Sequence, residues 1–539
     1  MTRLGPAIED DLHLGTARRS WRGMLGAVRC LLGHPRATGE ILSARLTGRR
    51  LRARQKLAAL IGIDHRLARP PRILDRVPPA AGMPGDDILV LGDGVLVSGA
   101  PERIAAAFAA DPELQALYGD ALVQRRPDGP VLPLLPPVFD PDRLAAFDYL
   151  GPLLACRRAS LDPDVRPNGP SDAAFRIAER YGPQAIGHVP EILSVRRGDP
   201  TGDAWPAGEG AQARHREALR GHLDRVGRSG WRITRAADGL LRVANPLPDP
   251  RPLVSIIVPT RDRLDLLRPC LDSMRACTDW PSIEILICDN DSREPETLDF
   301  LRALEREGRG LVVPCPGPFN FAAMNNAAAA RARGELLVFV NNDVEAFRPD
   351  WLTLMAREAL RPEVGAVGAK LLDGEGRIQH GGIVLGTGGL VTHAHRHFPA
   401  DAPGYLSALN ATHAVSAVTA ACLVVEAEKF RAVGGFDDAV FAVDFNDVDL
   451  CLRLNAAGHR TLLVPGAVLH HREAASRRWT PEARARHERE IVALRRRWGP
   501  LLTQDPHYHP GFDPDLSTHA RLRAGFPEAG AASLRRPLA

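Results

Sequence analysis

The stretch Leu253-Val254-Ser255-Ile256-Ile257-Val258-Pro259-Thr260-Arg261-Asp262 decides the fold predicted for this chain. Its β-branched and apolar first half is typical of a strand that is buried on both faces of a parallel sheet. The stretch follows the proline-rich segment Pro246 to Pro252, which indicates a domain boundary. Polar residues come directly after the strand. Because ligands bind beyond the carboxyl ends of parallel strands, we expect function at Thr260 and its neighbours.

Strands and helices alternate after this first strand. The pattern predicts helices near 264–277, 294–307 and 321–333, and strands over 283–288, 311–313 and 335–340. Such alternation indicates right-handed βαβ units and therefore an α/β fold. Two further strands run into polar residues, Asp289-Asn290-Asp291-Ser292 and Asn341-Asn342-Asp343.

The glycine pattern excludes a classical dinucleotide-binding fold. Such a fold would place G-x-G-x-x-G after its first strand, and that motif is absent there. The run Gly386-Thr387-Gly388-Gly389 lies outside any opening βα turn, and we interpret it as a loop or hairpin.

The composition is that of a globular protein with two to four domains, because 45% of its 539 residues are apolar and 25% are charged. The net charge of +4 is small, so we expect no nucleic acid partner. Eight cysteines are scattered without a CxxC pair, which indicates reduced thiols. The sequence contains neither a run of roughly 18 apolar residues nor a secretory apolar core, so we expect a cytoplasmic location.

The start of the chain is locally basic. Many arginines lie between Arg18 and Arg54, with few acids and with Trp21, Leu25 and Leu32 among them. This mixture favours either peripheral contact with the anionic inner face of the plasma membrane or a solvated basic helix or arm.

Seven motifs in the second half of the chain carry a family resemblance: Val254 to Asp262, Asp289 to Ser292, Asn320 to Asn326, Asn341 to Asp343, Gly434-Gly435-Phe436-Asp437, Asn446 to Arg453 and His470-His471. In order and spacing these motifs resemble glycosyltransferase family 2, a GT-A-fold family with bacterial members that build surface polysaccharides. The resemblance implies an inverting enzyme that transfers a hexosyl or deoxyhexosyl group from a nucleotide-sugar donor to a glycan or lipid-linked glycan acceptor. The alternative is a non-catalytic nucleotide-sugar or glycan-binding scaffold.

By this resemblance, Asp343 and the distant His471 hold a divalent metal, Mn²⁺ or Mg²⁺. Such a cation neutralises the diphosphate leaving group, and an imidazole ligand favours Mn²⁺. Asn341 stands where the family has the first Asp of a D-x-D-like motif, so we expect it to contact the ribose or a metal-bound water. A polar turn is the alternative for Asn341 to Asp343. The adjacent His470 leaves the choice of histidine open.

Asp447 matches the family's catalytic base, which takes the proton of the acceptor hydroxyl. The family commonly has Glu-Asp where this chain has Asn446-Asp447, and a helix-capping carboxylate is the alternative role. We interpret Asp449 and Arg453 as an intrahelical ion pair. The resemblance implies this donor-binding set: Pro259, Thr260, Asp289, Asn290, Asn326, Asn341, Asn342 and Asp343.

The run His-Ala-His-Arg-His at 393–397 would place three imidazoles on one face of a strand. A second metal site is one interpretation of this pattern. A polar rim of the acceptor groove or a solvated strand face is favoured over it, because no nearby cysteine or carboxylate completes a metal site.

An upstream segment echoes the second half of the chain at the level of pattern. Asp87 to Asp93 echoes the strand that ends in Asp343, Tyr149 to Arg158 echoes Ala420 to Val425, and Asp172 to Arg176 echoes Asp449 to Arg453. In this alignment Pro170 stands at the base position and Arg196 at the metal histidine. We hypothesise a degenerate, truncated GT-A-like region, with an unrelated α/β linker domain as the alternative.

These observations predict five segments: a basic, mostly helical region (1–80), the degenerate GT-A-like region (81–200), a helical or extended connector (201–250), the catalytic GT-A domain (251–490) and a C-terminal tail (491–539).

Overall fold

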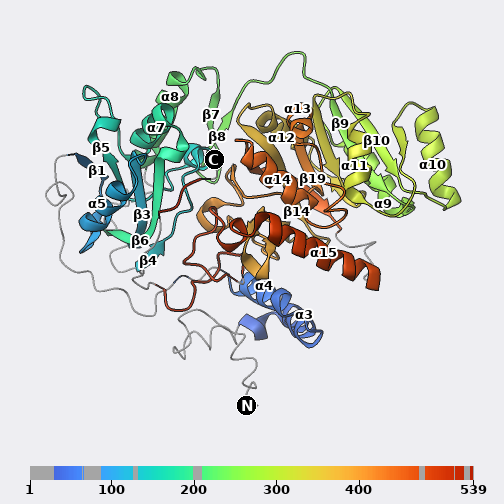
Figure 1. Ribbon diagram of the computed structural model, residues 1–539, viewed down its shortest axis with the longest axis horizontal. Helices are drawn as coiled ribbons and strands as arrows, with labels where there is room; N and C mark the ends of the chain where they lie inside the picture. Colours follow the sequence, from blue (N-terminus) through green and yellow to red (C-terminus); the bar gives the residue numbers. More distant parts are fainter. Residues whose placement is uncertain are drawn as a thin grey trace. The chain divides into compact units, whose positions relative to one another are not determined.

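The computed structural model describes residues 30–62, 65, 87–124, 131–197, 209–472, 480–514, 516–526 and 534–537. The predicted basic stretch before residue 30, which includes Arg18 and Trp21, lies outside the described residues. The chain forms two compact units (Figure 1). Unit 1 comprises Met1–Asn245 with Pro506–Leu538, and unit 2 comprises Pro246–Asp505. This division differs from the five predicted segments, because 201–245 and 506–538 belong to unit 1.

The centre of unit 2 is the parallel sheet that its sequence predicts. The parallel strands follow the order β11 (Leu311–Pro314), β10 (Ile283–Asp289), β9 (Val254–Thr260) and β12 (Leu336–Val340). The helices that connect them are α9 (Leu264–Ala276), α10 (Pro295–Arg306) and α11 (Phe321–Ala329). The α/β prediction is therefore confirmed, with boundaries within a few residues of those expected.

Beyond β12 the sheet of unit 2 becomes mixed. Strand β19 (Cys422–Glu426) runs antiparallel to both β12 and β14 (Val364–Leu372). Strand β14 is parallel to β20 (Arg460–His471), and the short β13 (Val344–Ala346) pairs antiparallel with the end of β20. Strand β13 therefore brings residue 343 to the end of β20.

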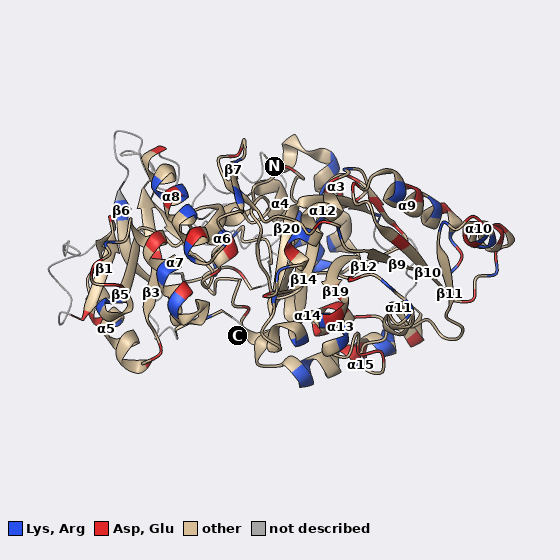
Figure 2. Ribbon diagram, turned by 90° about the horizontal axis from the view of Figure 1, so that it is seen from above, with Lys and Arg blue, Asp and Glu red and all other residues tan. Residues whose placement is uncertain are grey.

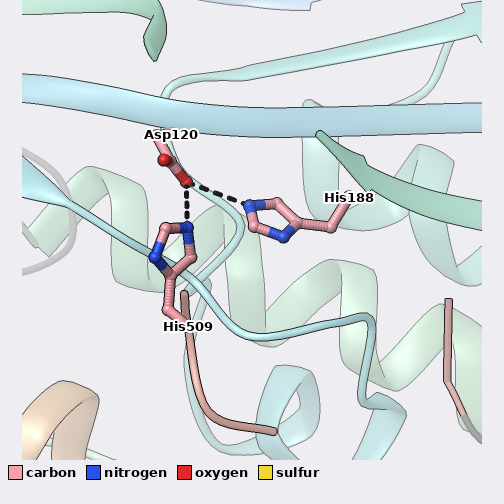
Figure 3. A group of neighbouring side chains, drawn as sticks. All are labelled: Asp120, His188 and His509. Carbon is pink, nitrogen blue, oxygen red and sulfur yellow. Dashed lines mark hydrogen bonds and ion pairs between the residues drawn. The ribbon is translucent and has the colours of Figure 1, made fainter. Parts of the chain in front are cut away.

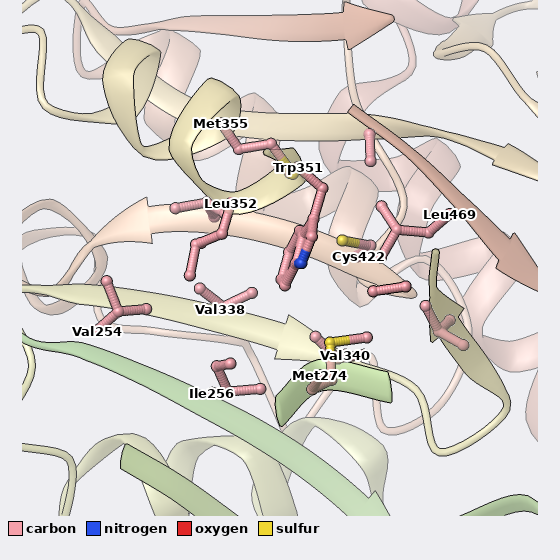
Figure 4. Close-up of a cluster of buried hydrophobic side chains, with 14 of the residues drawn as sticks. Val254, Ile256, Met274, Val338, Val340, Trp351, Leu352, Met355, Cys422 and Leu469 are labelled. Atoms are coloured by element: carbon pink, nitrogen blue, oxygen red, sulfur yellow. The ribbon is translucent and has the colours of Figure 1, made fainter. Parts of the chain in front are cut away.

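Helices cover both faces of this sheet because alternate residues of each strand point to opposite sides. One core contains side chains of α9, α10 and α12 (Trp351–Ala359), and the other contains side chains of α11, α13 (Ala427–Ala432) and α14 (Asn446–Ala456). Figure 4 shows Trp351 in the first core, among strand residues such as Val338 and Val340. The indole N–H of Trp351 donates to the carbonyl of Cys277 at 3.0 Å, so this buried polar atom is satisfied.

A small hairpin lies outside the main sheet of unit 2. The glycine run 386–389 connects β16 (Ile383–Leu385) to its antiparallel partner β17 (Val391–His393), so the prediction of a loop or hairpin is confirmed. The strand expected through 393–397 was wrong, because β17 ends at His393. His395 and His397 adopt φ of 54° and 68°, which no β-strand permits. The three imidazoles therefore do not share a strand face.

Unit 1 contains its own sheet, in the order β1-β5-β3-β6-β2, with β4 beside β3. The strands are β1 (Ile88–Gly92), β2 (Val95–Leu96), β3 (Ala116–Gln124), β4 (Val131–Leu134), β5 (Leu153–Arg157) and β6 (Ile186–Arg197). A separate hairpin contains β7 (Arg232–Arg235) and β8 (Leu241–Ala244). The helices are α3 (Pro35–Leu46), α4 (Arg50–Ile61), α5 (Ala100–Ala110), α6 (Pro141–Ala146), α7 (Pro170–Tyr181) and α8 (Glu209–Arg225).

The two sheets share one topology. The unit 1 order β1-β5-β3-β6-β2 corresponds to β12-β19-β14-β20-β13 in unit 2, in both chain order and strand direction. In each sheet the third and fourth strands are parallel, and every other neighbouring pair is antiparallel. Among the residues that the structure describes, unit 1 has no counterpart of β9, β10 or β11. Unit 1 thus repeats the second half of the unit 2 sheet.

Candidate active site

Asp343 and His471 meet at the edge of the unit 2 sheet. Asp343 directly precedes β13, and β13 pairs with the end of β20, where Val344 lies opposite His471. The Asp343 Oδ1 and His471 Nε2 atoms are 3.3 Å apart, and both side chains are less than a tenth exposed. Two such atoms in one shielded place are a suitable donor set for a divalent cation.

The strand register separates His471 from its neighbour. Successive residues of a strand point to opposite faces, so His470 is turned away from Asp343. The ring of His470 instead lies against Phe347, with ring centroids 4.5 Å apart. His471 is therefore the histidine that faces the carboxylate.

Asp447 lies in the first turn of α14, where its half-buried carboxylate accepts two backbone hydrogen bonds. One comes from the N–H of Val448 at 2.8 Å and the other from the N–H of Ala420 at 3.1 Å. Burial raises the pKa of the Asp447 carboxyl, and these hydrogen bonds lower it in part. A carboxylate with a raised pKa is a stronger base than an exposed one.

The segment before β19 brings the carboxylate and the metal-binding candidates to the same part of unit 2. Ala420 donates to Asp447, and the carbonyl of the next residue, Ala421, accepts from the N–H of Asn341. Asn341 is two residues before Asp343. The potential base and the potential cation ligands thus converge on one end of the sheet.

Two of the predicted donor-binding residues contact each other across neighbouring strand ends. The Asn342 amide N–H donates to the Thr260 hydroxyl at 3.1 Å. This bond joins the ends of β9 and β12, as expected for a site beyond the carboxyl ends of the strands. Pro259, which is also in β9, is buried, and the half-buried Asp289 accepts from the backbone N–H of Ser292.

The side-chain amides of Asn290 and Asn326 form hydrogen bonds with backbone groups of loops. Asn290 donates to the carbonyls of Cys315 and Gly317, at 2.7 and 3.0 Å. Asn326 accepts from the N–H of Phe436 and donates to its carbonyl. In both cases the amide fixes a loop at the site, while the amide oxygen of Asn290 makes no hydrogen bond to another described residue.

The glycine pair before Phe436 makes this last contact possible. Gly435 has φ of 69°, and a Cβ at this position would lie 2.8 Å from the Asn326 amide oxygen. Only glycine combines this backbone conformation with so close an approach.

The corresponding place in unit 1 holds an ion pair. In unit 1, Asp93 lies two residues before Val95, which pairs with Val195, the residue before Arg196. In unit 2, Asp343 lies two residues before Glu345, which pairs with His470, the residue before His471. Asp93 and Arg196 therefore correspond in position to Asp343 and His471. The Asp93 Oδ2 and Arg196 Nη2 atoms are 2.8 Å apart. A guanidinium group therefore stands beside the carboxylate at this position of unit 1.

Sequence reasoning missed a second histidine and carboxylate cluster, in unit 1. Figure 3 shows Asp120 between His188 and His509, whose Nε2 atoms lie 3.0 and 2.9 Å from the same Asp120 oxygen. Burial raises the pKa of Asp120 to about 6 and lowers that of His188 to about 4. Asp120 is 68 positions from His188 and 389 from His509 along the chain, so no local sequence motif predicts the cluster.

The hydrogen bonds of His509 favour a structural role for this cluster over metal binding. Its Nδ1 accepts from the backbone N–H of Gly511 at 2.9 Å, which places the ring proton on Nε2. That N–H donates to Asp120, so Nε2 has no lone pair to offer a metal. The cluster therefore ties the returning segment 506–538 to the sheet of unit 1.

Comparison with known proteins identifies the family. Residues 255–381 match the family model described as "Glycosyl transferase family 2". The O-antigen biosynthesis protein RfbC of Myxococcus xanthus is 37% identical over 439 residues, which is 79% of this chain and 34% of the relative. Uncharacterized protein y4gI of Sinorhizobium fredii is 41% identical over 346 residues, which is 63% of this chain and 38% of that protein.

The chain spans between about a third and two fifths of the length of these curated relatives. Among solved structures, the mannosyltransferase PcManGT of Pyrobaculum calidifontis, in complex with GDP-Man and Mn²⁺, is 21% identical with a TM-score of 0.34. That match covers 48% of this chain and 70% of the other. From the family match, this chain contains a glycosyltransferase family 2 domain over residues 255–381.

Proposed function

We propose that the chain is an inverting, metal-dependent glycosyltransferase that moves a hexosyl or deoxyhexosyl group from a nucleotide-sugar donor to a glycan or lipid-linked glycan acceptor. The observation that carries this proposal is the Asp343 and His471 pair, which lies at the same sheet end as the Asp447 carboxylate. A role in surface-polysaccharide synthesis is supported by the similarity to the O-antigen biosynthesis protein of Myxococcus xanthus.

Asp343 and His471 would hold a divalent cation, Mn²⁺ or Mg²⁺. Their oxygen and nitrogen atoms are of the types that these ions accept, and the imidazole favours Mn²⁺. A bound cation would neutralise the negative charge that develops on the diphosphate as the glycosidic bond breaks. Asn342, held by Thr260, would border the nucleoside part of the same donor.

Asp447 would take the proton of the acceptor hydroxyl as that oxygen attacks the anomeric carbon. The N–H groups of Ala420 and Val448 fix the orientation of the carboxylate, so it meets the acceptor without rearrangement. Attack from the face opposite the diphosphate is a single displacement, and it inverts the anomeric configuration.

We propose that unit 1 is a truncated, non-catalytic copy of the second half of unit 2. Its sheet repeats the topology, its metal position is filled by the Asp93 and Arg196 ion pair, and Pro170 stands at the base position. The ion pair of Asp172 with Arg176 repeats that of Asp449 with Arg453, which supports this alignment.

Asp343→Ala is expected to abolish Mn²⁺-dependent donor binding, because it removes the anionic ligand of the cation. Thermal shift against a panel of sugar nucleotides with Mn²⁺ should find one donor that raises Tm strongly, by mass action, and chelation should remove the effect. The same donor should leave the Tm of the Asp343→Ala variant unchanged.

Asp93→Ala is the matched control, because Asp93 has the corresponding place in unit 1. This variant should keep both the donor-induced Tm shift and a stoichiometry of one Mn²⁺ per chain in calorimetry. A donor-induced increase in Tm that is unchanged by chelator, or that persists in Asp343→Ala, would refute the proposed metal site.

We also propose peripheral contact with an anionic membrane through α3 and α4. Exposed leucines occur on α3, where Leu42 and Leu46 are 46% and 87% exposed on one helix face. The stretch from 30 to 62 has one acid, Glu40, and seven basic residues (Lys and Arg are blue in Figure 2): Arg36, Arg45, Arg49, Arg50, Arg52, Arg54 and Lys56. No helix of the described residues is both long and apolar enough to cross a bilayer.

Replacing Leu42 and Leu46 by aspartate is expected to weaken vesicle binding by about 10²- to 10⁴-fold, because each of the two leucines contributes roughly 1.5–3 kcal/mol when it is buried. The measurement is co-sedimentation with vesicles of phosphatidylcholine and phosphatidylglycerol. Val492→Asp, at a 64% exposed position of α15 (Pro481–Trp498), is the control and should bind like the parent. Equal sedimentation of all three proteins would contradict this contact.

A further inference from the structure

His471 and His509 each have an Nε2 atom beside a carboxylate, and they differ in what faces the other ring nitrogen. His509 has a backbone N–H at its Nδ1, as described above. His471 has the side-chain oxygen of Gln379, Oε1, at 3.3 Å from its Nδ1. A donor and an acceptor at this position select opposite tautomers of a neutral imidazole.

An acceptor at Nδ1 leaves the Nε2 lone pair free. A neutral imidazole carries one ring proton, and the Gln379 oxygen draws that proton to Nδ1. The Nε2 atom of His471 then presents a lone pair on the side of Asp343, 3.3 Å away. Metal-ligating histidines usually donate their other N–H to such an oxygen, which fixes both tautomer and ring orientation.

The surroundings of Gln379 keep its amide in place. It lies in β15 (Ile378–His380), which pairs antiparallel with the end of β14, and its side chain is 3% exposed. Strand β14 pairs in turn with β20, which carries His471. Two strands of the main sheet thus hold the amide oxygen and the imidazole against each other, and solvent does not compete for either.

We propose that Gln379 is a positioning residue for the metal site, which holds His471 in the tautomer that binds the cation through Nε2. This inference rests on the proposed metal dependence, and it assigns a role to a residue outside the motifs that resemble the family. Gln379 itself contributes no ligand atom, so its loss weakens the site without removing a ligand.

Gln379→Leu is expected to weaken Mn²⁺ binding by roughly 10- to 100-fold, because leucine keeps much of the volume but has no acceptor. Affinity is measured by isothermal titration calorimetry and by electron paramagnetic resonance of free Mn²⁺, with the sugar nucleotide present. Gln379→Glu retains an oxygen that can only accept, and it should bind Mn²⁺ at least as tightly as the parent.

A double mutant separates positioning from general damage. In a His471→Ala background, Gln379→Leu should have no further effect on Mn²⁺ affinity, because the ring that it orients is gone. Parental Mn²⁺ affinity in Gln379→Leu would overturn the inference, and so would equal losses in the Leu and Glu variants. If the parent itself binds no Mn²⁺, the proposed metal dependence fails instead, so the two failures are distinguishable.

Discussion

Asp447→Asn is expected to lower the rate of sugar transfer by roughly 10²- to 10⁴-fold, the usual contribution of a positioned general base. Asparagine preserves the shape of the side chain and can still accept from the N–H of Ala420, but it cannot take a proton. Donor affinity should stay close to that of the parent, because the base acts on the acceptor. The measurement is steady-state transfer beside donor Kd from calorimetry.

The pH dependence of the parent enzyme tests the same carboxylate. Burial raises the pKa of Asp447 above its ordinary value of 3.8, and the base works only when it is ionised. As pH falls, kcat/KM should therefore decline through a pKa higher than that of an exposed aspartate. The residual activity of Asp447→Asn should lack this decline. Parental activity in the variant would remove Asp447 from its catalytic role.

The first half of unit 2 was predictable because its signals are local. Each strand from β9 to β12 is rich in apolar residues and a helix connects each strand to the next, so parallel pairing follows from the helical crossovers. The mixed part of the sheet was not predictable in the same way. Strand β19 pairs with β12 from some eighty positions away along the chain, and no local pattern specifies such a partner.

The residues of the candidate site were likewise predictable from local motifs, whereas their contacts were not. The order of motifs selected Asp343, His471 and Asp447, and the strand register then showed which of two adjacent histidines faces Asp343. Asn290 and Asn326 were chosen for the polarity of their amides. In the structure those amides bind backbone groups of loops, and polarity alone does not reveal where those groups lie.

The upstream segment was aligned with the second half of the chain on weak sequence patterns alone. Arg196 was placed at the metal position from a loose alignment, and the strand register puts it beside Asp93 at the corresponding point of unit 1. The return of 506–538 to unit 1 was missed, because the buried contact of His509 with Asp120 depends on tertiary structure.

Asp449→Ala is expected to lower the free energy of unfolding of unit 2 by about 3–5 kcal/mol, because it removes the centre of a buried polar network. The Asp449 carboxylate is fully buried and accepts from three groups: Arg453 Nε at 2.7 Å, Arg497 Nη1 at 2.8 Å and Trp498 Nε1 at 2.9 Å. These bonds confirm the ion pair expected for Asp449 and Arg453, and they attach α15 to α14.

The lower end of that range is the expected value, since Arg453 and Arg497 are 21% and 34% exposed and can regain water when the carboxylate is lost. Equilibrium urea unfolding followed by tryptophan fluorescence measures the change. Asp265→Ala is the control: that side chain is 64% exposed beside Arg263, so its loss should cost less than about 1 kcal/mol. Similar small losses in both variants would mean that the buried network contributes no more to stability than a surface ion pair.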